Sequence, residues 1–369
     1  MIRIAFDHQI FSVQRYGGIS RYYSELIKSM SKTYKNKACI QIAAPIHINK
    51  YLETSRVNFP AVGYCLPRIP WATQISKITN KIFTPAILRS WKPNIVHETY
   101  YCKSTVAPHC SRIVLTVYDM VHEIFQDTLI YPEATIIAKR KAVKRADHII
   151  CISRSTANDL IRILDVNPRK ISVIHLGCST PGQQTSSYPI NQKPFILYVG
   201  PRNGYKNFKR LLEAYAFISG LKEEFDLICF GGGEFSKLEL ELFSYHGINN
   251  NSIKQLDGPD QLLAKLYSQA SIFVYPSLYE GFGLPPLEAM SYECPVICSN
   301  TSSMPEVCGD AALFFDPLSS RSISQAINNV LSSKDLQMTL RALGKKRLEL
   351  FSWESCSKKT FDVYTRLMT

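Results

Sequence analysis

Hydrophobic and polar residues follow two alternating patterns along this chain. Short apolar runs, typical of strands buried on both faces, alternate with longer stretches whose apolar residues recur at helical spacing. The stretch after Gly17-Gly18 is an example, with Ile19, Tyr22 and Leu26 on one face of a predicted helix. Repeated strand–helix units predict parallel sheets covered by helices.

The pattern places strands and helices along the whole chain. Strands are expected at Ile2–Phe6, Cys39–Ala43, Ile95–His97, Ile113–Val117, His148–Ile152, Ile171–Ile174, Phe195–Val199, Phe225–Phe230, Ser271–Tyr275, Val296–Ser299 and Ala312–Phe315. Further helices are expected at Trp71–Ser90, Glu133–Ala146, Ser155–Ile163, Phe208–Ile218, Gln261–Gln269, Pro286–Ser291, Ser322–Leu331 and Leu336–Leu350.

The length and one polar stretch predict two domains. A chain of 369 residues exceeds what one hydrophobic core usually serves. Between Gly177 and Lys193 the composition shifts to Ser, Thr, Gln, Pro, Asn and Gly, which is typical of a linker. We therefore expect two doubly wound, Rossmann-like α/β domains, at residues 1–177 and 178–352. Open α/β sheets bind ligands at the carboxyl ends of their strands, so function should lie in strand-to-helix loops facing a central cleft.

The N-terminal residues, the apolar runs and the cysteines indicate where the protein is located and whether it binds a metal. The first residues, Met1 to Asp7, read as a buried strand rather than a signal peptide, and no apolar run approaches the length of a membrane span. The eleven cysteines include no set at zinc-ligand spacing. We expect reduced thiols, no metal site and a cytoplasmic location.

The net charge of +13 favours anionic partners. Five of the cations, Lys139, Arg140, Lys141, Lys144 and Arg145, fall within one predicted helix. They form either a solvated helix face or a patch for an anionic membrane surface or an acceptor.

The segment from Tyr275 to Ala289 carries the most chemistry. It follows a strand, contains the sequence Glu-Gly-Phe-Gly-Leu-Pro-Pro-Leu-Glu from Glu280 to Glu288, and leads into a helix. Its glycines let a ligand approach the backbone, and its prolines suit the first positions of a helix. The amides before such a helix can bind hydroxyl or phosphate oxygens. Taken singly, each glutamate is more often a solvated or dipole-complementing side chain.

This complete arrangement resembles family 4 of the retaining glycosyltransferases, which have the GT-B fold. The resemblance implies that Glu280 lies at the donor sugar and that Glu288 binds the ribose hydroxyls of the nucleotide. It also implies that backbone amides of Gly281, Phe282, Gly283 and Leu284 contact the sugar and the phosphates. By analogy with GT-B proteins, the last helix, within residues 353–369, crosses back to the N-terminal domain.

A second loop, from Leu197 to Asn207, also follows a strand. Sugar transfer needs positive charge at the departing diphosphate, and Arg202 and Lys206 can supply it, although two surface cations are common in any loop. The resemblance implies that these two residues clamp the diphosphate and, with Glu280, form the catalytic group. It predicts that Arg202→Ala lowers kcat by about 10²–10³. The chain has no Asp-x-Asp motif, so neither a metal nor a cofactor is expected.

The remaining site predictions concern the nucleobase and the acceptor. Gly17 and Gly18 are expected to face the donor diphosphate, and the base is expected near Gly258. In the N-terminal domain His97, Tyr118 and Asp119 end or follow strands, and we expect them on the acceptor side. Asp119 is also a candidate catalytic residue, or else the cap of a local turn. Relatives often have histidine where this chain has Tyr118.

Together the resemblance implies a retaining, metal-independent hexosyltransferase in bacterial surface-polysaccharide synthesis, resembling mannosyltransferases. The expected donor is GDP-mannose ahead of a UDP-hexose. The expected acceptor is a glycan or lipid-linked glycan at the inner face of the cell membrane. We favour front-face substitution, because no residue stands out as a carboxylate nucleophile. Competing interpretations are a nucleotide-sugar epimerase of the same fold and a basic protein that binds nucleic acid or membranes without catalysis.

Overall fold

The computed structural model describes residues 1–54, 62–129, 131–179, 193–202, 204–217 and 221–369. Its contacts divide the chain into two compact units. Unit 1 comprises Met1–Gln126, Ile130–Gly177 and Ser352–Thr369, and unit 2 comprises Asp127–Leu129 and Cys178–Phe351. This division differs from the predicted boundaries at residues 127–129 and at residue 352. Most of the predicted linker lies outside the described residues.

Unit 1 is built on a seven-stranded parallel sheet with the order β3-β2-β1-β4-β5-β6-β7. Its strands are β1 (Ile2–Asp7), β2 (Ala38–His47), β3 (Val62–Cys65), β4 (Ile95–Glu98), β5 (Arg112–Val117), β6 (His148–Cys151) and β7 (Ile171–Val173). The registers pair Phe6 with Ile42 on one side of β1 and with His97 on the other. The carboxyl ends of β1 and β4 therefore lie side by side.

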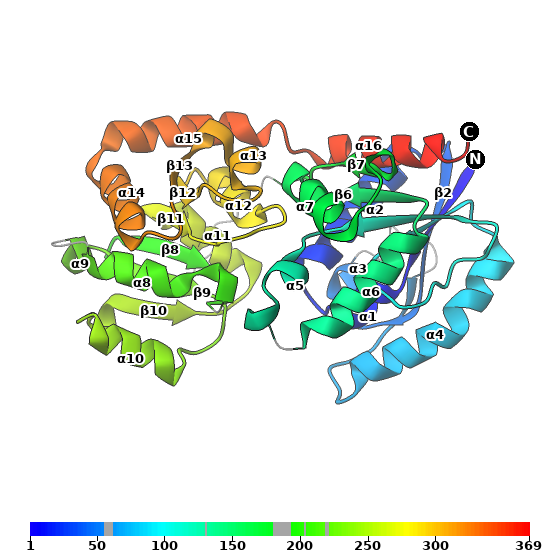
Figure 1. The fold of residues 1–369 in the computed structure, drawn as a ribbon, viewed down its shortest axis with the longest axis horizontal. Coiled ribbons are helices and arrows are strands. Elements are labelled where there is room, and N and C mark those ends of the chain that lie inside the picture. The colour runs from blue at the N-terminus through cyan, green and yellow to red at the C-terminus, as the bar shows by residue number, and fades with distance from the viewer. Residues whose placement is uncertain (55–61, 130, 180–192, 203, 218–220) are drawn as a thin grey trace. The chain divides into compact units, whose positions relative to one another are not determined.

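Helices cover this sheet. They are α1 (Gln9–Val13), α2 (Gly18–Thr33), α3 (Lys50–Thr54), α4 (Ala72–Trp91), α5 (Val121–Ile124), α6 (Pro132–Arg145), α7 (Arg154–Leu164) and α16 (Trp353–Arg366). The last helix, α16, packs along α2 and brings the C-terminus beside the N-terminus (Figure 1). The stacked rings of Tyr34 and Phe361, with centroids 3.9 Å apart, are part of this contact.

Unit 2 repeats the plan with a six-stranded parallel sheet of order β10-β9-β8-β11-β12-β13. Its strands are β8 (Phe195–Val199), β9 (Asp226–Phe230), β10 (Ile253–Leu256), β11 (Ile272–Tyr275), β12 (Val296–Ser299) and β13 (Ala312–Phe315). Its helices are α8 (Phe208–Phe217), α9 (Leu221–Glu224), α10 (Lys237–Tyr245), α11 (Asp260–Gln269), α12 (Leu284–Ser291), α13 (Met304–Cys308), α14 (Ser320–Ser332) and α15 (Lys334–Leu348).

The fold class predicted from the hydrophobic pattern is confirmed: both units are parallel α/β sheets with helices. Every predicted strand and helix is present with small shifts of its ends. The pattern missed β3, which is an edge strand, and β10, whose sequence Ile-Lys-Gln-Leu is half polar. Edge strands are partly solvated and carry weaker apolar runs. It also missed α10 and several helices of four or five residues.

Local chemistry explains where some helices begin. The Ser153 hydroxyl accepts from the Thr156 amide at the start of α7. Ser236 and Glu239 form a reciprocal capping box at the start of α10. Such caps satisfy amides that the first helical turn leaves without partners. Within the described part of the chain, no helix is both long enough and apolar enough to span a bilayer.

Candidate functional site

The carboxyl edge of the unit 2 sheet has a topological switch point between β8 and β11. Strand β8 pairs with β9 on one side and with β11 on the other, so the chain leaves β8 and β11 in opposite directions. The loops that follow these strands, residues 200–207 and 276–283, start next to each other. Open α/β sheets bind ligands at this kind of position.

Lys206 and Glu280, which come from these two loops, form an ion pair. The Lys206 Nζ atom lies 2.6 Å from Glu280 Oε1, and the two side chains are only 13% and 12% exposed. The same ammonium group donates to the Tyr275 hydroxyl at 3.3 Å. The structure thus brings together two of the residues predicted to handle the donor, and it concentrates one positive and one negative charge in a partly desolvated place.

Serine and threonine side chains from the loop after β12 hold the Glu280 loop in shape. The Glu280 amide donates to Ser302 Oγ at 2.9 Å, and the Ser303 hydroxyl lies 2.9 Å from the carbonyl oxygens of both Glu280 and Phe282. Thr301 donates to the Leu278 carbonyl at 3.0 Å. These supports were not predictable from the sequence, because a Ser-Ser pair in a loop has no distinctive pattern.

Asn207 fastens the other side of the same loop. Its side-chain amide, which is buried, donates to the carbonyl oxygens of Pro276 at 2.9 Å and Pro317 at 2.8 Å. The Leu278 amide donates to the Tyr205 carbonyl at 2.7 Å. The loop carrying Lys206 and the loop carrying Glu280 therefore form one cross-linked assembly. This fixes the distance between their charged groups.

Gly283 ends the loop in a conformation that favours glycine, with φ at +94°. A Cβ atom there would lie 2.2 Å from Met304 Cε. Helix α12 begins at the next residue, Leu284, two residues earlier than predicted, so Glu288 lies in its second turn. The Glu288 carboxylate accepts from the Tyr267 hydroxyl at 3.4 Å. Gly281 and Phe282 are buried along the loop.

Arg202 makes its contacts within the protein. Its guanidinium donates to Glu239 Oε1 at 2.6 Å and to the carbonyl oxygens of Gly231, Gly233 and Glu234 at 2.8–3.0 Å. The side chain is 4% exposed. These contacts engage all three guanidinium nitrogens within the protein. The diphosphate clamp formed by Arg202 and Lys206 stays a prediction, and we call the Arg202 contacts with Glu239 and residues 231–234 the arginine cage.

The cage explains the glycine run that follows β9. Gly231, Gly232 and Gly233 all have φ between +73° and +84°, which few other residues adopt. This conformation allows the carbonyl groups of Gly231 and Gly233 to meet the guanidinium of Arg202. The Gly258 residue follows β10 at the same edge of the sheet, where a Cβ would lie 2.8 Å from Leu262 Cδ2. Its role beside a nucleobase stays a prediction.

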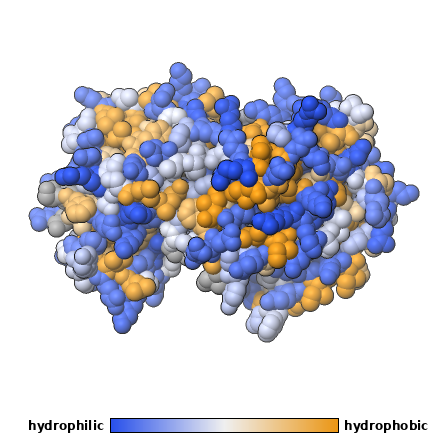
Figure 2. All heavy atoms as spheres, viewed as in Figure 1, coloured by the Kyte–Doolittle hydropathy of each residue, from blue (hydrophilic) through white to orange (hydrophobic). Residues whose placement is uncertain are grey.

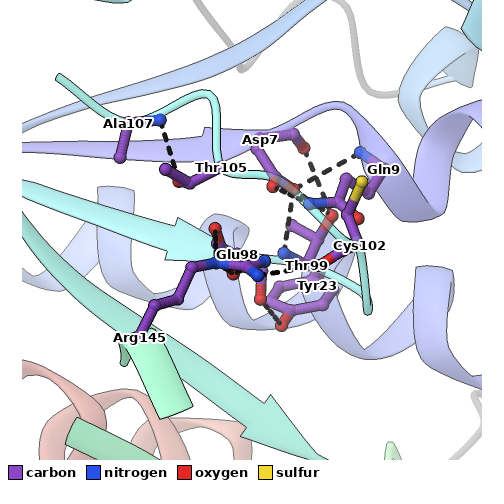
Figure 3. A network of polar contacts seen from close by, with 9 residues as sticks. All are labelled: Asp7, Gln9, Tyr23, Glu98, Thr99, Cys102, Thr105, Ala107 and Arg145. Carbon is purple, nitrogen blue, oxygen red and sulfur yellow. Dashed lines mark hydrogen bonds and ion pairs between the residues drawn. The ribbon is translucent and has the colours of Figure 1, made fainter. Parts of the chain in front are cut away.

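Unit 1 has its own switch point, between β1 and β4, and polar residues join the two strand ends (Figure 3). The Asp7 carboxylate accepts from the Thr99 amide at 2.8 Å and from the Thr99 hydroxyl at 2.6 Å. Its second oxygen accepts from the Gln9 side chain at 2.8 Å. Asp7 is completely buried, so these bonds replace its hydration and rigidify the strand ends.

A buried ion pair lies beside this network. Arg145 approaches Glu98 with two nitrogens, at 2.9 Å from Nε to Oε1 and 2.6 Å from Nη2 to Oε2, and donates to the Cys102 carbonyl at 2.7 Å (Figure 3). Glu98 is completely buried. Burial raises the pKa of Glu98 to about 7, although the hydrogen bonds from Arg145 act in the opposite direction.

His97 and Tyr118 are core residues, so the prediction that they line an acceptor pocket is wrong. His97 is completely buried, and its ring nitrogens lie 2.6 Å from the Tyr364 hydroxyl and 2.8 Å from Thr116 Oγ1. Burial lowers the pKa of His97 to about 3. Tyr118 is 5% exposed and donates to Tyr23 at 2.8 Å. In unit 1 these inward-facing side chains at the ends of the strands pack against α2 and α16.

Asp119 acts as the cap of a local turn, which was the second of its two predicted roles. Its Oδ1 atom accepts from the Val121 amide at 3.1 Å. The side chain is 31% exposed and lies 3.9 Å from Lys139 Nζ. Its role on the acceptor side stays a prediction.

The predicted basic patch on α6 is made smaller by ion pairs. Lys139 is completely buried, where it pairs with Glu123 at 2.7 Å and donates to the Asp119 carbonyl at 2.9 Å. Arg145 is bound to Glu98. Two of the five cations are therefore structural, while the remaining three, Arg140, Lys141 and Lys144, are exposed and lie on one face of the helix.

A cavity of about 490 Å³ opens near the carboxyl ends of β1 and β4. Its lining includes His8 and Gln9 after β1, Tyr100 and Tyr101 after β4, and three lysines, Lys77, Lys81 and Lys103. This cavity was not predictable from the sequence, because its residues come from separate segments with no common motif. Cationic and aromatic groups of this kind can bind a phosphorylated sugar or a glycan.

Gly17 and Gly18 lie at the start of α2. A short helix, α1, separates them from β1. A Cβ on Gly17 would lie 2.4 Å from Gln14 Oε1, the atom that accepts from the Ser20 amide at 3.1 Å. Gly17 is therefore needed for a close local contact. Its proposed approach to the donor stays a prediction.

Comparison with known proteins gives a consistent result. Residues 16–180 match the family described as "Glycosyltransferase Family 4", and residues 183–347 match "Glycosyl transferases group 1". The chain is 32% identical to O-antigen chain mannosyltransferase B of Escherichia coli over 95% of its own length and 96% of that protein. Its fold is similar to sucrose-phosphate synthase of Thermosynechococcus elongatus (TM-score 0.72, 18% identity, 100% and 99% of the two chains covered). It is also similar to Anabaena HepE in complex with UDP and glucose (TM-score 0.72, 15% identity, 99% and 100% covered).

Proposed function

Because this chain belongs to family 4 of the glycosyltransferases, we propose that it transfers mannose from GDP-mannose to a hydroxyl of a lipid-linked glycan during bacterial surface-polysaccharide synthesis. The similarity to the O-antigen mannosyltransferase supports this substrate class, since it extends over nearly the whole of both chains. We propose further that the reaction needs no metal ion and retains the anomeric configuration.

The observation that carries the proposal is the Lys206–Glu280 pair at the switch point of unit 2. A sugar nucleotide presents both a diphosphate, which needs a cation, and sugar hydroxyls, which need an acceptor. The pair offers both within one rigid assembly. When the diphosphate binds, the Lys206 ammonium can donate to it while keeping Glu280 as a neighbour, because an ammonium group has three donors. Glu280 then accepts from the sugar.

We assign Lys206 to the leaving group in this proposal, because the arginine cage engages Arg202. Charge developing on the diphosphate is stabilised best by a group that is already in place and poorly hydrated. Lys206 fulfils both conditions, since its side chain is mostly buried and lies between two aromatic rings, Tyr205 and Tyr275. Amides of the Glu280 loop add dipoles at the same place.

Retention follows in our proposal from front-face attack. The acceptor hydroxyl approaches on the side from which the diphosphate departs, and a phosphate oxygen takes its proton as the bond to the sugar carbon forms. The broken bond joins the sugar carbon to the phosphate oxygen, whose electron pair stays with the diphosphate. Unit 1 would supply the acceptor through the cavity near Tyr100 and Tyr101, which carries the cationic and aromatic groups described above.

Two measurements test the donor and the reaction. GDP-mannose should raise the unfolding temperature more than UDP-glucose, because only a ligand that binds the folded state stabilises it. With a lipid-linked acceptor, transfer should continue in EDTA, and nuclear magnetic resonance should show an α-linked product. An epimerised donor without any transfer would instead indicate an epimerase, and loss of transfer in EDTA would contradict the metal-free mechanism.

A matched pair of variants tests the site itself. Lys206→Met should lower kcat by about 10²–10³, the magnitude expected for one preorganised charge at the reacting centre. Lys209→Met removes an exposed lysine three residues further along and should leave kcat within about twofold. If Lys206→Met reduces kcat less than about threefold, Lys206 does not stabilise the leaving diphosphate.

A further inference from the structure

Helix α4 of unit 1 buries a polar face. The residues that face the sheet at four-residue spacing are Ala72, Ser76, Asn80, Thr84 and Leu88. Ser76 and Asn80 donate to the Ile46 carbonyl at 2.9 and 2.6 Å, and Thr84 donates to the Ala43 carbonyl at 3.3 Å. The helix is therefore attached to β2 largely by hydrogen bonds, and most of its large apolar side chains are not used for this contact.

Those apolar side chains lie on the outside. Trp71, Ile75, Ile78, Ile82 and Phe83 are 71%, 40%, 63%, 64% and 54% exposed. All but Phe83 are spaced by four, three and four residues, which places them on one face of the helix. In Figure 2 hydrophobic surface is visible at the lower right edge, where α4 runs in Figure 1. We call the set formed by Trp71, Ile75, Ile78 and Ile82 the α4 apolar face. Isolated exposed apolar residues are ordinary, but a continuous face of this kind marks an interaction surface.

The charge around the α4 apolar face has a single sign. The sequence contains no Asp or Glu between Glu53 and Glu98. The cations Arg68, Lys77, Lys81, Arg89 and Lys92 in and beside the helix are all exposed. Lys77 and Lys81 also line the 490 Å³ cavity. A partner for this surface must therefore be apolar where it meets the isoleucines and anionic where it meets the lysines.

A lipid bilayer with anionic headgroups has both properties. A second copy of this chain does not offer both properties, because a symmetric contact would place the same lysines and arginines opposite one another. Trp71 at the start of the helix suits the same partner, since tryptophan prefers the boundary between headgroups and acyl chains.

We infer that α4 docks unit 1 on an anionic membrane surface, with the α4 apolar face inserted between lipids and the flanking cations on headgroup phosphates. The cavity bordered by Lys77 and Lys81 then opens beside the bilayer. As regards the lipid-linked acceptor the inference rests on the proposed function, but lipid binding is measurable without any acceptor.

Cosedimentation of the full chain with vesicles tests the apolar part. Vesicles containing phosphatidylglycerol should bind at least tenfold more tightly than pure phosphatidylcholine at low salt. Ile78→Glu with Ile82→Glu should weaken binding to the anionic vesicles about thirtyfold or more, because apolar burial is lost and two like charges approach the lipid phosphates. The matched control is Leu318→Glu with Met338→Glu, which adds the same charges at side chains 65% and 62% exposed on unit 2. It should change binding less than threefold.

A second pair of variants tests the charged part. Lys77→Gln with Lys81→Gln should weaken binding to anionic vesicles about thirtyfold, from about 1 kcal/mol for each lysine near the surface. Lys345→Gln with Lys346→Gln, which removes two exposed lysines of α15, should have no more than a threefold effect. Unfolding curves check that each variant folds, as expected for exposed positions.

Three results would overturn the inference. The first is wild-type binding by the Ile78 and Ile82 variant, and the second is equal binding to neutral and anionic vesicles. The third is a wild-type dimer that this variant converts to a monomer, which would make α4 an interface between copies. Failure of the proposed function is distinguishable, since it would show as absent mannose transfer to a water-soluble acceptor by every variant while the vesicle results hold.

Discussion

Replacing Arg202 by alanine separates a structural role from a catalytic one. The guanidinium makes one ion pair and three hydrogen bonds to carbonyl groups, all at 3.0 Å or less, and it packs over the Phe235 ring at 4.6 Å. Breaking a buried ion pair by removing one partner typically costs about 3–5 kcal/mol. Glu239 keeps the Ser236 amide and hydroxyl as donors, at 2.7 and 2.8 Å, so we expect the lower end, about 3 kcal/mol.

The assay must report on unit 2 separately. The three tryptophans, Trp71, Trp91 and Trp353, all belong to unit 1, so urea unfolding followed by tryptophan fluorescence reports on that unit. Circular dichroism also detects unit 2. Arg202→Ala should shift part of the circular dichroism transition to lower urea and leave the fluorescence transition in place. Arg321→Ala, which truncates an exposed arginine of α14, is the control and should cost less than about 0.5 kcal/mol.

The activity of Arg202→Ala does not distinguish the two roles, because loss of the cage would also disturb residues 231–234. Stability does distinguish them. If the variant unfolds at the same urea concentration as the wild type while kcat falls by about 10²–10³, the guanidinium contributes nothing to the fold. The clamp implied by the family resemblance would then be the correct assignment, and the arginine cage would be refuted.

Three further changes test other parts of the structure. Arg145→Met should destabilise unit 1 by about 3–5 kcal/mol at pH 8, because it leaves the Glu98 carboxylate buried without its cation. The control is Arg112→Met, which breaks the exposed ion pair between Arg112 and Asp147 and should cost less than about 1 kcal/mol. Since the pKa of Glu98 is raised to about 7, the folded state binds this proton more readily than the unfolded state, and the penalty should shrink as pH falls from 8 to 5; a penalty independent of pH in urea unfolding would exclude the buried charge as its cause. The pKa of His97 is lowered to about 3, so the unfolded state takes up the proton first and wild-type stability should fall as pH decreases from 6.5 towards 3; His97→Gln should remove this part of the slope in thermal unfolding, and an unchanged slope would contradict it. Gly283→Ala should cost about 1–3 kcal/mol and weaken nucleotide binding, because φ is +94° and Met304 must move, whereas Gly18→Ala, which meets open space, should leave stability unchanged or slightly higher; equal unfolding curves for both variants would show that the turn tolerates a side chain.

The candidate site was partly predictable from the sequence. Glu280 and Lys206 were identifiable because each follows a strong apolar strand within a recognisable loop, and strands that neighbour each other bring such loops together. Asn207, Ser302 and Ser303 were not identifiable, because their function depends on carbonyl groups of distant segments. The contacts of Arg202 were not identifiable for the same reason, since its partner Glu239 lies on a helix that the pattern missed.

The sequence by itself determined the class of fold, the positions of most strands and helices, and the loops in which chemistry is concentrated. These properties depend on local spacing, since burying an apolar strand or helix face is decided within a few residues. Only the tertiary structure decided which charges are neutralised and which apolar residues stay exposed. Lys139 became a buried partner of Glu123, while Ile78 and Ile82 came to face outwards. The physical reason is that desolvation and ion pairing depend on residues distant in the chain, and no local pattern encodes those neighbours.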